Sequence, residues 1–319
     1  MDTGLWLVDS EPWFVVNSLR INLKFIQPPL LFVYHPPFIL HNLPFLSPNP
    51  QSLIPNSHPM KIATWNVNSI RTRLNHVVNW LTEHPVDVLC LQETKVVDEK
   101  FPKEPLIEMG YQVVTFGQPS YNGVAILSRE PLSDVNRGFS PLLGDQFAEF
   151  DEQKRVITGI TDDLRIVNLY VPNGSSVGSD KYQYKLKWLD VLYEYLQALL
   201  QEPNHVLVCG DFNIALEDID IHDPTGREQQ VMATDAEREA LRVILNLGFA
   251  DAFRKFTTEG GHFSWWDYRA GSFRRNAGWR IDHIYLTPDL YTKAIACTID
   301  KTPRSLEQPS DHVPVIVEL

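Results

Sequence analysis

The chain has 319 residues and a formal net charge of −12, with 44% hydrophobic and 21% charged residues. This composition is ordinary for a soluble globular protein, and the length allows one large domain or two ordinary ones. The acidic charge argues against a protein that coats nucleic acid, because phosphate binding needs local positive charge. An enzyme is not excluded, since carboxylates that hold a metal contribute negative charge of their own.

The three cysteines, Cys90, Cys209 and Cys297, lie far apart in apolar runs. Their spacing does not fit a zinc site, so we expect buried free thiols in a reducing compartment. This favours a cytoplasmic protein, and we separately expect it to act as a monomer.

Residues 1–59 differ from the rest, because ten of the 23 prolines fall there. The apolar stretch at 30–46 is broken by prolines, which excludes a membrane-spanning helix, and a signal or transit peptide fits poorly. We therefore expect no contact with a membrane. Met60 directly precedes the first convincing strand, which suggests that Met60 is the natural start. The hypothesis is a non-native or disordered N-terminal extension over 1–59, followed by one folded domain over 60–319.

The first elements of this domain are a strand over 62–67 and a helix that Asn68 or Ser69 can cap. The helix is predicted from apolar residues at spacings of 4, 3 and 4, and Pro85 ends it. The stripe consists of Ile70, Leu74, Val77 and Leu81.

Strands over 86–92, 123–128, 156–160 and 164–170 follow, the last two joined by a turn at Asp162-Asp163. A long amphipathic helix is predicted over 180–201. Its expected buried face consists of Tyr182, Leu186, Leu189, Tyr193, Leu196 and Leu200.

A strand over 205–210 precedes a helix over 234–247, which a capping box of Thr234 and Glu237 opens and Gly248 closes. Strands over 279–286, 294–300 and 313–318 complete the chain. Many strands with few, spaced helices predict an α/β fold, with two packed sheets and helices outside.

Polar residues stand where the apolar strands stop. Carboxylates and amides brought to one edge of a sheet would form an oxygen-rich pocket of the kind that Mg²⁺ or Mn²⁺ prefers. Singly, each residue has a structural explanation at least as good, such as a turn former, a surface charge or a helix cap. The joint pattern favours a site: Asn66, Glu93, Tyr170, Asn173, Asp211, Asn213, Asp282, Asp311 and His312.

Six segments resemble, in order, the exonuclease III family of AP endonucleases. The resemblance covers essentially all of 60–319, and six motifs in order are highly specific. The segments are Thr64-Trp65-Asn66-Val67-Asn68, Leu91-Gln92-Glu93-Thr94-Lys95, Tyr170-Val171-Pro172-Asn173-Gly174, Gly210-Asp211-Phe212-Asn213, Gly278-Trp279-Arg280-Ile281-Asp282 and Ser310-Asp311-His312.

The resemblance implies the four-layer α/β sandwich of the DNase-I-like endonuclease/exonuclease/phosphatase superfamily, with two mixed β-sheets flanked by helices. It implies a nuclease of DNA repair, dependent on Mg²⁺ or Mn²⁺. Such an enzyme cleaves the phosphodiester 5′ to an abasic site and removes nucleotides or blocking groups from the 3′ ends of double-stranded DNA.

The resemblance also implies roles for matching residues. Glu93 looks like the principal metal ligand, with Asn66 and Asp311 nearby, and in some descriptions of the family Asp211, Asn213 and His312 also bind metal. As catalytic residues, Asp211 acts on the attacking water, Asn213 positions the nucleophile, Tyr170 lies near the phosphate, and Asp282 orients His312. Whether Asp211 or His312 handles the proton stays open. Asn68 stands where some members carry an aspartate, which leaves the number of metals open.

Residues 262–280 combine aromatic rings with Arg269, Arg274, Arg275 and Arg280, which suggests a DNA-binding surface. The alternative is a packed aromatic core, and for Trp266 and Tyr268 the two are evenly balanced. By resemblance Trp265 lines the pocket for a flipped-out abasic sugar. Arg71 and Arg73 are weaker candidates for phosphate contacts. The predicted DNA-binding residues are Asn68, Lys95, Asn173, Trp265, Arg269 and Trp279.

Two other functions compete. One is a superfamily enzyme for a small phosphoester, such as an inositol phosphate, which would share the Asp211-x-Asn213 and Asp311-His312 elements; the arginine-aromatic segment favours DNA. The other is a catalytically silent DNA-binding or scaffold protein, which would not need Glu93, Asp211 and His312 together.

Overall fold

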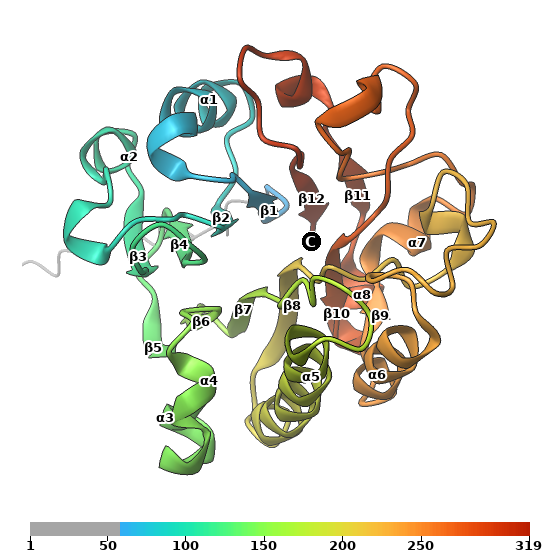
Figure 1. The fold of residues 1–319 in the computed structure, drawn as a ribbon. Coiled ribbons are helices and arrows are strands. Elements are labelled where there is room, and N and C mark those ends of the chain that lie inside the picture. Colours follow the sequence, from blue (N-terminus) through green and yellow to red (C-terminus); the bar gives the residue numbers. More distant parts are fainter. Residues whose placement is uncertain (1–57) are drawn as a thin grey trace, which may run out of the picture. The chain divides into compact units, whose positions relative to one another are not determined.

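In the computed structural model, which describes residues 58–319, two six-stranded sheets pack face to face between helices. The predicted four-layer α/β sandwich is thereby confirmed (Figure 1). Residues 1–57 lie outside the described part of the chain. The predictions of a non-native or disordered extension over 1–59 and of a start at Met60 depend mainly on these residues and stay predictions. Within the described range, no helix has the length and hydropathy needed to cross a membrane.

The first sheet has the strand order β11-β12-β1-β2-β4-β3, and the second β5-β6-β7-β8-β10-β9. The strands of the first are β11 (Ala296–Ile299), β12 (Val315–Glu318), β1 (Lys61–Asn66), β2 (Val88–Gln92), β4 (Val124–Ser128) and β3 (Gln112–Phe116). Those of the second are β5 (Ser133–Arg137), β6 (Val156–Thr161), β7 (Leu164–Tyr170), β8 (His205–Asp211), β10 (Asp282–Leu286) and β9 (Ala250–Asp251).

Each sheet contains one central parallel pair, β1 with β2 and β7 with β8. β12 runs antiparallel to β1, and β10 runs antiparallel to β8. The carboxyl ends of the parallel strands therefore lie beside the amino ends of β12 and β10. This places the polar residues that end or precede six different strands along one edge of the sandwich.

Helices cover both outer faces (Figure 1). On the first sheet, α1 (Ile70–Glu83) packs Val77 and Trp80 against Trp65 and Leu91. On the second sheet lie α5 (Asp180–Leu199) and α6 (Asp235–Leu245), in one core cluster with β7 and β8. The short helices are α2 (Glu104–Glu108), α3 (Ser140–Leu143), α4 (Ala148–Asp151), α7 (Ala252–Phe256) and α8 (Pro288–Lys293).

Between the sheets lies an apolar layer that contains all three cysteines, buried and free as expected. One polar bridge crosses it. Asn168 of β7 donates its side-chain amide to the carbonyl oxygens of Leu91 and Ala125, at 3.0 and 2.8 Å, and accepts a 2.7 Å hydrogen bond from Gln92 Nε2. A buried amide that is left unpaired costs about 1–3 kcal/mol, so this bridge favours one alignment of the two sheets.

The long helix is rotated relative to its predicted face. Tyr182, Leu189 and Leu196 are buried, whereas Leu186, Tyr193 and Leu200 are only half-buried. The centre of the buried face consists of Lys185, Trp188, Leu192, Tyr195 and Leu199. The predicted buried face contained no charged residue, whereas Lys185 is buried in the structure.

Local details differ as well. The capping box of Thr234 and Glu237 is confirmed. Ser69 occupies the N-cap position of α1, but its hydroxyl pairs with the Thr72 hydroxyl at 3.1 Å, and the Asn68 side chain bonds to Asp311. Strands β3, β5 and β9 were not predicted, because the first two are edge strands with exposed, polar positions and the third has only two residues.

Arg280, predicted as part of a DNA-binding surface, is buried with 1% of its surface exposed. Its guanidinium donates to both carboxylate oxygens of Asp220, at 2.7 and 3.1 Å, and contacts Asp251 at 2.8 Å. It also lies 3.0 Å from Nδ1 of His283, whose Nε2 is 2.9 Å from the carbonyl oxygen of Ile214. His283 therefore fits as a neutral imidazole that accepts at Nδ1 and donates at Nε2.

His283 makes folding stability depend on pH. Burial, reinforced by Arg280, holds the pKa of His283 below its ordinary value of 6.5. At acid pH His283 therefore binds a proton in the unfolded chain but not in the folded chain. The stability from this difference is fully present above pH 6.5 and is lost as the pH falls below it, with a slope of at most about 1.4 kcal/mol per pH unit.

We expect the free energy of unfolding in urea to fall less steeply between pH 7 and 5 for His283→Gln than for the unchanged protein. Glutamine keeps a donor and an acceptor but takes up no proton, whereas all other titrating groups are common to both proteins. Parallel curves would show that His283 does not contribute.

Candidate active site

Backbone geometry at the edge of the sandwich brings side chains of both sheets together. Gly210, at φ 144°, immediately precedes Asp211, and a Cβ there would collide with the Leu169 carbonyl oxygen of the adjacent strand. Glu93 and Asn213 have φ values of 51° and 49°, in the left-handed region that such residues rarely adopt. The strands thus end in conformations that aim these side chains toward one another, at a cost that functional sites commonly carry.

Glu93 and Asp211 are held together by one amide. Asn66 Nδ2 lies 2.9 Å from both Glu93 Oε1 and Asp211 Oδ2. Tyr170 donates its hydroxyl to the same Glu93 oxygen at 2.9 Å, and Lys95 Nζ lies 2.6 Å from the other. Asn66 turns its amide nitrogen, not its oxygen, toward the carboxylates in this structure, so its role as a metal ligand stays a prediction.

The electrostatics of the cluster follow from burial and from these partners. Burial raises the pKa of Glu93, but Lys95 and Asn66 outweigh it, and the pKa of Glu93 lies below its usual value. Burial and the nearby Glu93 raise the pKa of Tyr170 well above its usual value. Tyr170 therefore remains a phenol that donates a hydrogen bond to a carboxylate.

His312 lies between two aspartates. Its Nδ1 is 2.8 Å from Asp282 Oδ2, and its Nε2 is 3.7 Å from Asp211 Oδ2. Burial lowers the pKa of His312, but Asp282 and Asp211 more than compensate and raise it to about 10. Burial raises the pKa of Asp211 to about 7, although His312 acts in the opposite direction. The imidazole is thus a buried cation beside a carboxylate that titrates near neutrality.

The donor set fits a divalent cation. Ligand atoms of Glu93, Asp211 and His312 all lie within 4.8 Å of one another. The carboxylates of Glu93, Asp211, Asp282 and Asp311 gather here around the cations Lys95 and His312, so carboxylates predominate in the connected cluster. Carboxylate oxygens are the preferred ligands of hard divalent ions. Burial is the main cause of the raised pKa of Asp211, and the nearby Asp282 and Glu93 act in the same direction.

Two amides extend the cluster along the second sheet. Asn213 donates Nδ2 to the Val171 carbonyl oxygen at 3.0 Å and to Asp211 Oδ2 at 3.2 Å. Its own Oδ1 accepts from Asn173 Nδ2 at 2.8 Å. Asn173, predicted both as a strand-end residue of the site and as a DNA contact, is therefore coupled to Asn213.

Asp311 lies beside the cluster on the side of the first sheet. Its oxygens accept from Asn68 Nδ2 at 2.9 Å and from Trp265 Nε1 at 3.0 Å. Asn68 Oδ1 in turn accepts from Lys95 Nζ at 2.6 Å. Asn68 and Lys95, predicted as DNA contacts, thus connect Asp311 to Glu93, while the part of Asp311 as a metal ligand stays a prediction.

The aromatic segment divides into core and surface. Trp266 is fully buried, so the core alternative holds for it, and Trp279 is also buried and meets Trp265 edge to face, with ring centroids 6.4 Å apart. Trp265 is half-buried, and Tyr268 is exposed. Arg269 is exposed and pairs with Asp267 at 2.6 Å. The structure brings Trp265 to the cluster through Asp311 and gives Arg269 no hydrogen bond to any of the other described site residues.

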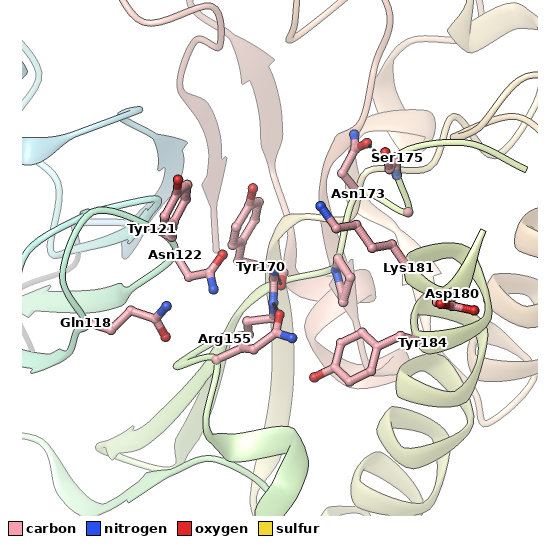
Figure 2. A pocket seen from close by; sticks show the side chains of 13 residues that line it. Gln118, Tyr121, Asn122, Arg155, Tyr170, Asn173, Ser175, Asp180, Lys181 and Tyr184 are labelled. Carbon is pink, nitrogen blue, oxygen red and sulfur yellow. Dashed lines mark hydrogen bonds between the residues drawn. The ribbon is translucent and has the colours of Figure 1, made fainter.

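A cleft of about 880 Å³ adjoins the cluster at Tyr170 and Asn173. Figure 2 shows Gln118, Tyr121 and Asn122 on one side and Lys181 and Tyr184 on the other. Arg155 lies between, with its guanidinium 4.5 Å from the centre of the Tyr170 ring and Nη1 donating to the Tyr170 carbonyl oxygen at 3.1 Å.

The sequence interpretation missed these cleft residues. Most lie on loops or helix turns without a motif of their own. Arg155, two residues after Gln153 and directly before an apolar strand, followed the same strand-end pattern as the predicted residues and could have been found.

Comparisons with known proteins agree with this site. The model of the endonuclease/exonuclease/phosphatase family matches residues 63–312. Exodeoxyribonuclease III of Haemophilus influenzae is 33% identical over 271 residues, which are 81% of this chain and 99% of that protein.

Two solved structures are similar over the same range. An AP endonuclease from Archaeoglobus fulgidus superposes with a TM-score of 0.76 and 42% identity, covering 81% of this chain and 98% of that one. The 3′ phosphatase NExo from Neisseria, bound to a product DNA hairpin, gives 0.77 and 39%, covering 82% and 99%. The resemblance seen in the six segments is confirmed, and the chain belongs to the endonuclease/exonuclease/phosphatase family, as an exonuclease III-type nuclease.

Proposed function

We propose that this protein is a DNA repair nuclease that hydrolyses the phosphodiester 5′ to abasic sites and removes nucleotides or blocking groups from the 3′ ends of double-stranded DNA. The observation that carries the proposal is the gathering of Glu93, Asp211 and His312 within 4.8 Å, with Asn213 bonded to Asp211. The relatives named for abasic-site and 3′-end chemistry support the substrate. We further propose that it acts as a monomer in the cytoplasm.

The proposed chemistry uses side chains of both sheets. Glu93, with Asp211 beside it, would hold Mg²⁺ or Mn²⁺, which would neutralise phosphate charge and stabilise the leaving alkoxide when bound. A protonated His312 has no free lone pair and would not be a ligand at the same time. Asp211 takes the proton of the attacking water, because its carboxylate is bonded to Asn213, lies 3.7 Å from His312 Nε2 and has a pKa that burial raises above its usual value. His312, kept protonated by Asp282, donates to a phosphoryl oxygen as negative charge develops there. Asn213 positions the water against Asp211.

In this proposal the DNA strand continues from Tyr170 into the adjoining cleft. Arg155 and Lys181 supply positive charge there, and Tyr121 exposes 70% of its surface as an aromatic platform. On the opposite side, Trp265 lines the place of the abasic sugar. The acidic chain thus has local cations where a backbone would run.

The direct test is cleavage of a labelled duplex with one abasic site, compared with an intact blunt duplex, a 3′-phosphorylated nick and an inositol phosphate. We expect cleavage at the abasic site with Mg²⁺ and none with a chelator. Asp211→Asn and His312→Ala should fold normally and lower kcat by about 10²–10⁴, the usual contribution of acid–base groups.

Activity on the inositol phosphate alone would overturn the DNA assignment in favour of a small phosphoester. Wild-type rates in either variant would remove that residue from the mechanism.

Metal binding can be tested without activity. Saturating Mn²⁺ should raise the melting temperature of the unchanged protein, because a ligand at about 100 times its Kd stabilises the folded state by about 2.7 kcal/mol. Glu93→Gln keeps the shape but removes a charged ligand, and it should abolish most of this rise. The exposed Glu239→Gln serves as the matched control and should keep it. An equal rise in both variants would place the ion elsewhere.

Asp282→Asn separates the charge of His312 from its position. The variant removes the nearest carboxylate that raises the pKa of His312, so the pKa should fall and the protonated imidazole should be lost as the pH rises. We expect kcat to fall by about 10² at pH 7.5 and to decline more steeply toward pH 9 than in the unchanged protein. A profile of unchanged shape would contradict a role for charged His312.

A further inference from the structure

A buried lysine ties together the loops that carry the two site amides. Lys185 of α5 and Glu237 of α6 are both 0% exposed, with Nζ 2.5 Å from Oε1. The same ammonium donates to the carbonyl oxygen of Asn213 at 2.7 Å and to that of Asn173 at 3.3 Å. An ammonium has three protons, and these three acceptors use all of them.

We propose that Lys185 is a positioning residue for the reaction, acting through the backbone of Asn213 and Asn173. Asn213 has a φ of 49°, a left-handed conformation that asparagine tolerates better than most residues but that gains from additional support. A hydrogen bond from an ammonium to its carbonyl holds that conformation, and with it the side-chain bonds to Asp211 and Asn173. This inference rests on the proposed function of the site.

A contribution to folding stability does not by itself explain why Lys185 and Glu237 are buried together. Replacing a buried ion pair by apolar residues is often neutral or even stabilising. Burial also lowers the pKa of Lys185, against the opposing effect of Glu237, which shows that the charge is costly here. What apolar side chains cannot supply is a donor to two carbonyl oxygens that follow β7 and β8.

Glu237 holds the lysine in place and has a second task. Its Oε2 accepts from the Thr234 backbone N–H at 3.1 Å as part of the capping box, and its Oε1 accepts from Met232 N at 3.0 Å. Glutamine at position 237 can keep the helix cap, because its one oxygen can accept from the Thr234 backbone N–H, whereas the Met232 N–H loses its acceptor. This permits a variant in which no buried charge is left alone.

The experiment compares Lys185→Met, the double variant Lys185→Met with Glu237→Gln, and Arg165→Met in the full chain. Arg165 of β7 is the matched control, because it is a buried cation in the sheet that α5 covers, paired with Glu202 at 2.6 Å and Asp134 at 2.5 Å, and it does not contact the site residues described above. We expect the double variant to fold and to lose at least tenfold in kcat, with KM within threefold. Arg165→Met should lower the melting temperature but keep kcat within twofold.

A double-mutant cycle adds a readout that a structural role would not move. In an Asn213→Ala background, the loss caused by the double variant should shrink at least threefold, because the side-chain amide that Lys185 positions is gone. A folded double variant with wild-type kcat, or losses that multiply fully, would overturn the proposal. If Lys185→Met alone does not fold, the double variant decides.

The outcome is separable from that of the proposed function. The unchanged protein is first assayed on the abasic duplex and on the other phosphoesters named above. If it cleaves another substrate, the abasic-site assignment fails, and the variant ratios measured on that substrate still test Lys185.

Discussion

The alignment of the two sheets is the constraint on which the site depends. The side-chain amide of Asn168 in one sheet donates to Leu91 and Ala125 of the other and accepts from Gln92. Sliding the sheets past each other would therefore leave buried polar atoms unpaired. Glu93 follows Gln92 directly, and Tyr170 lies two residues beyond Asn168. The 2.9 Å bond between Tyr170 and Glu93 is therefore a direct continuation of the bridge in the core.

From this alignment follows a division of labour between the sheets. The first sheet supplies Asn66 and Glu93, and the second supplies Tyr170, Asp211 and Asn213, while His312 and Asp282 enter from strands that run the opposite way. The result is a cluster of carboxylates, whose oxygens are the ligands that hard divalent cations prefer. Neighbouring groups have opposite pKa shifts, because Lys95 and Asn66 lower the pKa of Glu93 whereas burial raises that of Asp211.

The sequence predicted the layers and the polar residues at strand ends because both depend on short-range patterns. An apolar run that stops at Glu93 or Asp211 can be seen without knowing what packs against it. Lys185, Arg280 and the polar edge strand β5 could not be placed in this way. The partner of Lys185 lies 52 residues away and that of Arg280 lies 60 residues away, and only the tertiary fold tells a buried cation from a surface one. Trp266 was undecided for the same reason, since an aromatic ring suits core and surface equally.

The bridge through Asn168 also has a consequence for how this protein tolerates change over evolutionary time. Because Glu93 follows a strand of the first sheet and Asp211 ends a strand of the second, their separation is set by the filling of the layer between the sheets and not by any local loop. Core substitutions that shrink a residue in that layer would be felt first as lost turnover and only later as lost folding. We therefore expect residues in the layer between the sheets to be substituted more slowly during evolution than the maintenance of folding stability alone would require.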